Sequence, residues 1–226
     1  MKKIMFNDRY GLEQAVLEGR KSMTRRVINI PDKWRGIDVW GAAPDLSNQT
    51  LLLFDGDGYI MEDSEIGKTG QILPTYKNGE VVAVAQSYKD LGYPANTIQR
   101  GRCVRAGNHP GFVWDESDKG QLGDWFIDQL EGWGNKMFVH PNMCKNQIRI
   151  TNTTVERLRD ISSEDCLKEG IEARITGYHT FYYIHGEDRP YNFPKQAFAA
   201  LIEKISGKGI WEKNPWTFAY EFELVK

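Results

Sequence analysis

The clearest hydrophobic pattern lies at the end of the chain, where apolar and polar residues alternate. Apolar side chains occupy every second position over residues 216–224, and polar residues such as Thr217 lie between them. A period of two predicts a β-strand with one face in the core, here the face of Phe218, Tyr220 and Phe222. We therefore expect the chain to end in a core strand.

Three earlier segments also have strand patterns. Residues 51–61 carry two apolar runs around the turn sequence Asp-Gly-Asp-Gly at 55–58, which predicts a hairpin. The run Val-Val-Ala-Val at 81–84 predicts a buried strand. Ile148 and Ile150 alternate with polar neighbours and predict a strand that continues to about Val155.

Capping signals predict a first helix near the N-terminus. Asn7 or Asp8 is a suitable N-cap, and the apolar positions of the segment recur at helical spacing. Gly19 lies where a left-handed C-cap belongs. We expect the basic residues that follow Gly19 to form a loop held by this helix.

Two later helices are predicted by the same logic. Ser162 is a plausible N-cap for a short helix that Gly170 closes. Pro194 suits the first turn of a second helix, which should end before Gly207. Its apolar stripe is expected to be buried and consists of Phe198, Leu201, Ile202 and Ile205.

Several short strands with separate helices indicate an α+β fold, with a small mixed or antiparallel barrel as its core. Between about residues 88 and 140 the periodicity fades and glycines are frequent. We predict a folded, loop-rich insertion there. The 226 residues, 40% hydrophobic and 27% charged, are consistent with one domain that contains this insertion.

Charge and cysteine content narrow the classes of function. A net charge of -2 excludes nucleic-acid binding by bulk electrostatics, so any such binding must come from a local basic patch. The three cysteines are far apart and the four histidines are dispersed, which predicts reduced thiols, no metal site and no cofactor. Without an apolar leader or a long apolar run, we expect a cytoplasmic protein with no membrane partner.

The segment at residues 19–26, Gly-Arg-Lys-Ser-Met-Thr-Arg-Arg, carries the densest candidate chemistry. It combines four cations with two hydroxyls, and such groups can bind a phosphate or a nucleoside. The phosphate-binding candidates are Arg20, Arg25 and Arg26. The alternative is an ordinary solvated basic turn, because short basic runs are common.

Five segments in this order resemble the ASCH-domain family, in the long form common in phages and prophages. They are Leu-Glu-Gly-Arg-Lys-Ser-Met-Thr-Arg-Arg at 17–26, Gly-Glu-Val-Val-Ala-Val at 79–84, Val-Glu-Arg-Leu-Arg-Asp-Ile-Ser at 155–162, Glu-Gly-Ile at 169–171, and Gly-Lys-Gly at 207–209 with Asn-Pro-Trp at 214–216. The resemblance leaves residues 88–140 and 172–192 uncovered. As an ordered set it is specific, whereas each motif alone is weak.

The resemblance implies a PUA-like β-barrel with flanking helices and a cleft for RNA or a modified nucleoside. Some small bacterial members are amidohydrolases that deacetylate N4-acetylcytidine, and their catalytic positions correspond to Lys21, Thr24 and Glu169. One departure is the run Ala-Gln-Ser-Tyr at 85–88, where the long family commonly has an Arg-Glu-Thr-Trp-like sequence. A role for that strand in the site is therefore in doubt.

Amide hydrolysis needs a base, a nucleophile and a proton for the leaving amine, which Lys21, Thr24 and Glu169 could supply together. Neighbouring cations and burial would lower the pKa of Lys21. We thus hypothesise a basic cleft that binds a nucleoside or RNA segment and acts as an amidohydrolase on N4-acylated cytidine. The alternatives are a noncatalytic RNA or modified-base binding module, and a phage-derived interaction protein that works through its insertion.

Overall fold

The computed structural model describes residues 1–45, 49–63, 67–92 and 134–225. These residues form a mixed α+β structure, as predicted. Their contacts divide the chain into two compact units. The first unit comprises Met1–Phe6, Val81–Ile148 and Leu224–Lys226, and the second comprises Asn7–Glu80 and Arg149–Glu223. Most of the predicted insertion lies outside the described residues, so its structure and the single-domain assignment stay predictions.

The first unit is built on two short parallel strands, β1 (Lys3–Ile4) and β10 (Val81–Val84). The last three residues of β10 are buried, which confirms the strand predicted at 81–84. Two 3-10 helices follow the undescribed segment, η4 (Lys136–Phe138) and η5 (Pro141–Met143). The apolar cluster of this unit consists of Ala83, Tyr88, Leu91, Val139 and Cys144.

The core sheet of the second unit contains β11 (Gln147–Arg157), β14 (Trp216–Val225) and β2 (Met23–Val27), in that order. Strands β14 and β2 are antiparallel, with Tyr220 opposite Thr24 and Ala219 opposite Arg25. Phe218, Tyr220 and Phe222 are all buried, as the alternating pattern predicted. The C-terminal core strand is therefore confirmed.

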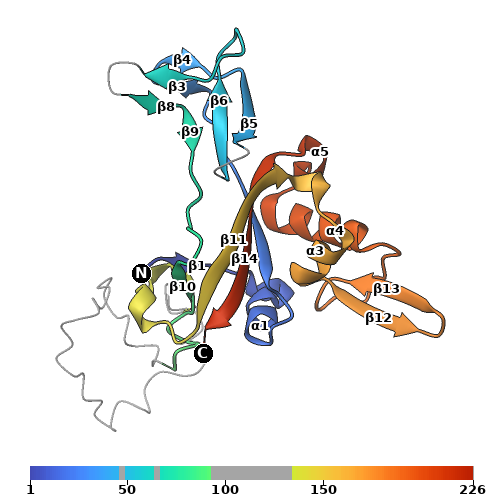
Figure 1. Ribbon diagram of the computed structural model, residues 1–226. Helices are drawn as coiled ribbons and strands as arrows, with labels where there is room; N and C mark the ends of the chain where they lie inside the picture. The colour runs from blue at the N-terminus through green and yellow to red at the C-terminus, as the bar shows by residue number, and fades with distance from the viewer. Residues whose placement is uncertain (46–48, 64–66, 93–133, 226) are drawn as a thin grey trace, which may run out of the picture. The chain divides into compact units, whose positions relative to one another are not determined.

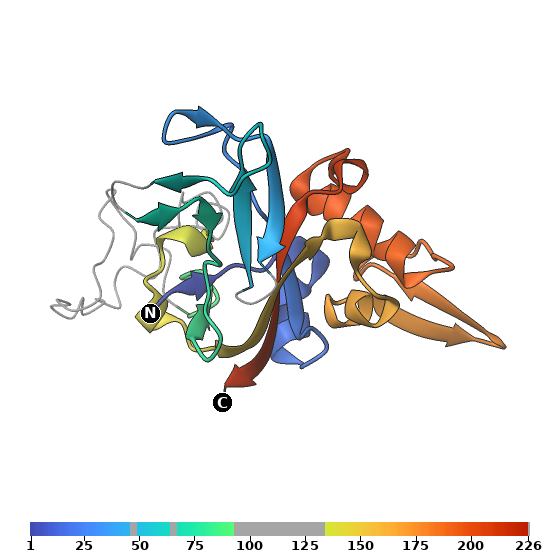
Figure 2. The same cartoon turned by 45° about the horizontal axis from the view of Figure 1, so that its top comes forward.

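The opposite face of β14 is covered as well. Thr217 is fully buried, and its hydroxyl donates to the carbonyl of Glu156 at 3.0 Å. Figures 1 and 2 both show the helices α3 (Ser163–Lys168), α4 (Pro194–Ser206) and α5 (Ile210–Lys213) gathered on one side of the long β11 and β14 strands. The sheet is thus buried on two sides near β2, which allows polar side chains of β2 to be enclosed.

The predicted first helix is divided at Gly11. A 3-10 helix η1 (Asp8–Tyr10) precedes this glycine and α1 (Leu12–Leu17) follows it. Gly11 has φ 59° and serves as C-cap of η1 and N-cap of α1. Asn7 caps η1 as predicted, since its side chain accepts a hydrogen bond from the backbone N–H of Arg9 at 3.0 Å.

The two later helices agree with their capping signals. The Ser162 hydroxyl accepts a hydrogen bond from the Asp165 N–H at 3.0 Å and so caps α3. α4 begins at Pro194 and buries Phe198, Leu201 and Ile202. Burial of Ile205 was a wrong prediction, because this residue is 37% exposed in the last turn of α4.

Small antiparallel sheets complete the second unit. They are β3 (Lys33–Trp34) with β4 (Ile37–Asp38), β5 (Gly41–Asp45) with β6 (Thr50–Phe54) and β9 (Gln71–Ile72), β7 (Glu62–Asp63) with β8 (Lys68–Thr69), and β12 (Glu172–Thr176) with β13 (His179–Tyr183). The chain does reverse at 55–58, where Phe54 bridges Ile60. The Met61 N–H donates to the Leu53 carbonyl at 2.9 Å, which confirms the predicted hairpin, and β6 also pairs with β5 and β9.

The predicted barrel is not observed in the described part of the chain. Closing a sheet into a barrel requires its two edge strands to pair with each other. Within the second unit the core sheet ends at β2, and the remaining described strands form separate small sheets instead of joining it. The α+β class is therefore confirmed, but a closed barrel is absent from the described residues.

Replacing Gly11 with alanine is expected to lower the free energy of unfolding by about 3 kcal/mol, because a left-handed backbone costs an L-residue about 1–2 kcal/mol and overpacking adds a similar amount. A Cβ at Gly11 would lie 2.3 Å from the His185 ring. Gly19 is a matched control, since it has φ 74° but open space around it. Gly19→Ala should cost about 1 kcal/mol in urea unfolding. Equal costs at the two glycines would show that the His185 contact is unimportant.

Candidate functional site

The second half of the basic segment at 19–26 is a strand, β2 (Met23–Val27), and not part of the loop that the sequence predicted. After α1 the chain is anchored at two points, where Lys21 N–H donates to the Ala15 carbonyl and Ser22 N–H donates to the Lys168 carbonyl, both at 2.9 Å. It then enters β2 at Met23. Pairing with β14 continues the sheet through these residues, so the segment is positioned by the core and by the end of α3.

Lys21 lies inside the second unit with its ammonium group enclosed. Its side chain is 1% exposed, and Nζ lies 2.6 Å from Oε2 of Glu169, whose side chain is 6% exposed. Nζ also donates to the carbonyl oxygens of Met23 and Glu169, each at 2.7 Å. The structure thus brings two of the three predicted catalytic residues into direct contact across 148 positions of sequence.

Arg25 approaches the same carboxylate from the adjacent strand. Its Nη1 lies 3.2 Å from Oε1 of Glu169, so the two oxygens of this carboxylate are held by different cations. The Arg25 guanidinium also donates to Glu156 at 2.6 Å and to Asp165 at 3.2 Å. Because the side chain is only 1% exposed, these internal carboxylates occupy the guanidinium. We therefore interpret Arg25 as an organiser of the site rather than a phosphate ligand.

Burial and charge shift the acid–base properties of this cluster. Burial is the main cause that lowers the pKa of Lys21, and the neighbouring Arg26 and Arg25 lower it further, although Glu169 partly opposes them. Burial alone would lower the pKa of Arg25, but Glu169 and Glu156 outweigh it and the pKa is raised. Burial raises the pKa of Glu156 in spite of Arg25. A lowered lysine pKa makes the neutral amine more accessible, as a base requires.

Thr24 and Arg26 lie on the other face of β2, because side chains alternate along a strand. Thr24 is buried and lies opposite Tyr220. Lys21 Nζ nevertheless contacts the Met23 carbonyl, which belongs to the peptide bond that joins Met23 to Thr24. The ammonium is therefore next to the Thr24 backbone, while the Thr24 side chain is directed toward the aromatic face of β14.

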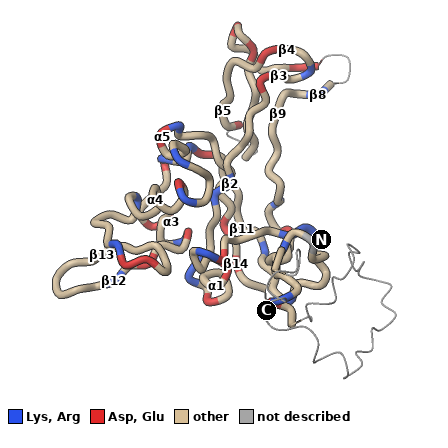
Figure 3. The backbone as a smooth tube through the Cα atoms, turned by 180° about the vertical axis from the view of Figure 1, so that it is seen from behind, with Lys and Arg blue, Asp and Glu red and all other residues tan. Residues whose placement is uncertain are grey.

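Arg20 is the most exposed of the predicted phosphate ligands. Its side chain is 38% exposed. It forms one ion pair with Glu18 at 2.6 Å and a second with Glu172 at 3.8 Å. The β12–β13 hairpin, which carries Glu172, has residues of both charge signs near its base (Figure 3). Any anion that binds Arg20 must compete with these carboxylates.

Two members of the cluster, Glu156 and Asp165, were not among the site residues predicted from the sequence. Glu156 lies in the segment Val-Glu-Arg-Leu-Arg-Asp-Ile-Ser at 155–162, and Asp165 lies in the first turn of the helix that Ser162 caps. Pairing of β2 with β14 and packing of α3 bring both carboxylates to Arg25. A buried arginine requires such partners, but sequence spacing alone does not identify them.

No group of three or more His, Cys, Asp or Glu residues suited to a metal ion occurs in the described residues. Among those residues no helix is sufficiently long and apolar to cross a membrane. Cys144 and Cys166 are buried free thiols, and burial raises the pKa of Cys166 to about 12. In comparisons with known proteins, no family model, no curated protein and no solved structure matches this chain.

Proposed function

We propose that the Lys21–Glu169 pair is the acid–base centre of an amidohydrolase that removes the acyl group from N4-acylated cytidine, in a PUA-like, ASCH-type cytoplasmic protein. The observation that carries this proposal is the 2.6 Å contact between the Lys21 ammonium and a buried carboxylate, at two of the positions that the family resemblance assigns to catalysis. Burial lowers the pKa of Lys21, which suits a general base.

The proposed reaction begins when the Lys21 ammonium loses its proton to solvent, which leaves a neutral amine beside Glu169. Lys21 then takes a proton from a water molecule, and the water oxygen forms a bond with the acyl carbon. Collapse of the tetrahedral intermediate breaks the bond between the acyl carbon and N4, while Lys21 returns its proton to N4. Water and amide are thereby converted to a carboxylic acid and cytidine.

Arg25 has a supporting role in this scheme. It binds Oε1 of Glu169 and leaves Oε2 directed at Lys21. Because Glu156 and Asp165 fix the guanidinium in turn, the position of Glu169 is determined by a network of side chains and not by one rotamer.

A second candidate function is a noncatalytic reader of RNA or of a modified base. The observation in its favour is that Lys21 Nζ already has three acceptors, two carbonyl oxygens and one carboxylate oxygen. An ammonium has only three hydrogens to donate, so this arrangement suits a fixed structural cation. In a reader, Arg20 and Arg26 would bind phosphates and no substrate would be converted.

Measuring the products cytidine and acetate distinguishes the amidohydrolase from the noncatalytic reader. We expect the protein to convert N4-acetylcytidine to cytidine and acetate, which chromatography resolves from the substrate. Controls are heat-denatured protein and N4-methylcytidine, which has no acyl carbon to attack. A protein that binds N4-acetylcytidine but releases no acetate would be a reader, and one that does neither would contradict both candidates.

A further inference from the structure

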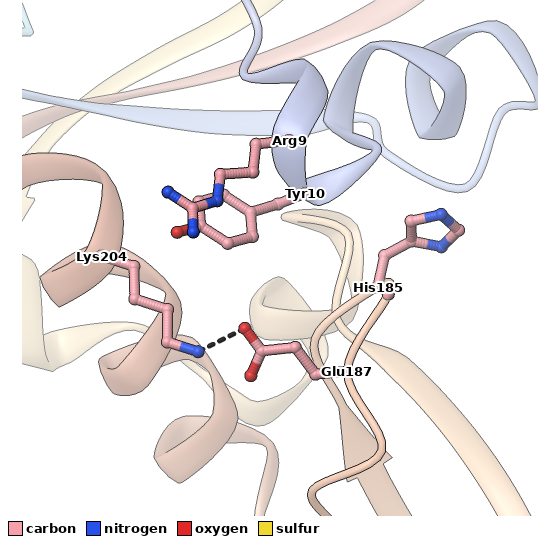
Figure 4. Close-up of a pocket in the computed structure, with 6 residues that line it drawn as sticks. Arg9, Tyr10, His185, Glu187 and Lys204 are labelled. Atoms are coloured by element: carbon pink, nitrogen blue, oxygen red, sulfur yellow. Dashed lines mark hydrogen bonds and ion pairs between the residues drawn. The ribbon is translucent and has the colours of Figure 1, made fainter.

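A cavity of about 490 Å³ lies in the second unit, and neither Lys21 nor Glu169 lines it. Its walls come from η1, from the turn after β13 and from α4. The lining residues are Arg9, Tyr10, His185, Gly186, Glu187 and Lys204 (Figure 4). This volume is within the range of small-molecule sites, roughly 300–1,000 Å³. The lining, however, is mainly polar and charged, so the matching ligand is polar.

Arg9 is the first reason to assign an anionic ligand. Its guanidinium lies over the Tyr10 ring at 5.8 Å from the centroid, and within the described residues it has no carboxylate partner. The Arg25 guanidinium, by contrast, has three carboxylates. A guanidinium stays charged and offers donors in a fork that fits phosphate oxygens. Arg9 is therefore available to an anion from outside the chain.

Lys204 and Glu187 form an ion pair across the space from Arg9 and Tyr10 (Figure 4). Both side chains are partly exposed, so the pair is accessible to a ligand. An anionic oxygen would share Lys204 with Glu187, whereas a hydroxyl group would donate a hydrogen bond to the Glu187 carboxylate. The cavity thus offers two cations for one end of a ligand and one acceptor for a hydroxyl-bearing end.

The rim of the cavity is held in place by His185. Its Nδ1 lies 2.6 Å from Oε1 of Glu172, and its ring packs on the backbone of Gly11. Burial tends to raise the pKa of Glu172, but hydrogen bonds from His185 and Arg174 outweigh this and keep the pKa below its ordinary value. The ionised carboxylate fixes the turn that carries Glu187, so the site is largely formed before a ligand binds.

We propose that this cavity binds a phosphate monoester with free hydroxyl groups, of the size of a sugar phosphate or a nucleoside monophosphate. The phosphate would lie between Arg9 and Lys204, and a hydroxyl would donate to Glu187. This site is separate from the proposed deacylation centre and does not depend on it, because the two share no residue.

The test is isothermal titration calorimetry at low ionic strength with four probes: ribose 5-phosphate, cytidine 5′-monophosphate, ribose and inorganic phosphate. We expect both phosphorylated sugars to bind at least tenfold more tightly than ribose or phosphate alone, because each end of the ligand adds contacts. Tighter binding of cytidine monophosphate than of ribose 5-phosphate would identify a nucleotide, and equal affinities a sugar phosphate. Equal affinity for all four probes, or no binding, would overturn the proposal.

Variants locate the site. Arg9→Gln and Lys204→Gln should each weaken binding of ribose 5-phosphate about tenfold. Lys195 is an exposed lysine on α4, the helix of Lys204, and Lys195→Gln should leave the affinity unchanged. Glu187→Gln should strengthen binding of inorganic phosphate, because the Glu187 carboxylate no longer competes for Lys204. It should also reduce the preference for ribose 5-phosphate, because the ligand hydroxyl loses its charged acceptor. Equal losses in the Lys204 and Lys195 variants would place binding elsewhere and overturn the assignment.

Discussion

Glu169→Gln is expected to lower the free energy of unfolding by about 3 kcal/mol, because removing one member of a buried ion pair leaves a charge without compensation. Glutamine keeps the size of the side chain but cannot neutralise Lys21. Arg25 loses one of its three carboxylates in the same substitution. Urea unfolding followed by circular dichroism at neutral pH measures this loss.

A control in α3, the helix that Glu169 caps, separates the effect of burial from that of charge. Glu164 also has a lysine partner, since it lies 3.3 Å from Lys168, but its side chain is 78% exposed. Glu164→Gln should change the free energy of unfolding by less than about 0.5 kcal/mol, as exposed ion pairs contribute little. Similar small losses for Glu164→Gln and Glu169→Gln would contradict the view that Lys21 depends on its buried carboxylate.

A double variant tests whether Lys21 and Glu169 act as a pair. Lys21→Met removes the charge and retains an apolar stem in the same space. If the cost of Glu169→Gln comes from the stranded ammonium, adding Lys21→Met should recover a large part of it, so the two changes should be non-additive by about 1–3 kcal/mol. Additive losses would mean that each residue is held by other contacts, such as the backbone carbonyls around Nζ.

Local sequence signals predicted the long core strands and the later helices of this fold, but not its small sheets or the strand β2. The period of two in residues 216–224 and the cap at Ser162 each depend on neighbours along the chain, and both are confirmed. The division of the first helix at Gly11 was missed, because a glycine inside a helical pattern was not interpreted as a break. Its cause is tertiary, since the His185 ring occupies the space of a side chain at this position.

The contacts of the candidate site are also tertiary, so local sequence signals did not predict them. Lys21 and Glu169 were paired only through a family resemblance, since no spacing rule connects residues so far apart. The basic appearance of residues 19–26 was misleading about exposure, because charged residues are seldom buried unless they are paired. Glu156, Asp165 and Glu169 supply those partners from β11 and α3. Only the packing of α3 on the sheet reveals that Arg25 belongs to the interior.

Lys21→Met is expected to reduce the turnover of N4-acetylcytidine by at least about 100-fold, the usual scale for loss of a general base. Methionine cannot accept a proton, although it fills most of the same volume. The measurement is kcat/KM from release of acetate. Lys208→Met is the control, because Lys208 is exposed at the end of α4 and is not part of the proposed centre. Its activity should equal that of the unmodified protein.

The pH profile distinguishes a catalytic role of Lys21 from a structural one. If neutral Lys21 is the base, kcat/KM should rise with pH as the ammonium loses its proton, and burial should move this rise below the ordinary lysine pKa of 10.5. Residual activity of folded Lys21→Met should lack the rise. A variant that is folded by circular dichroism and keeps both the rate and the rising limb would show that Lys21 only supports the structure, which would leave the reader as the better account of this site.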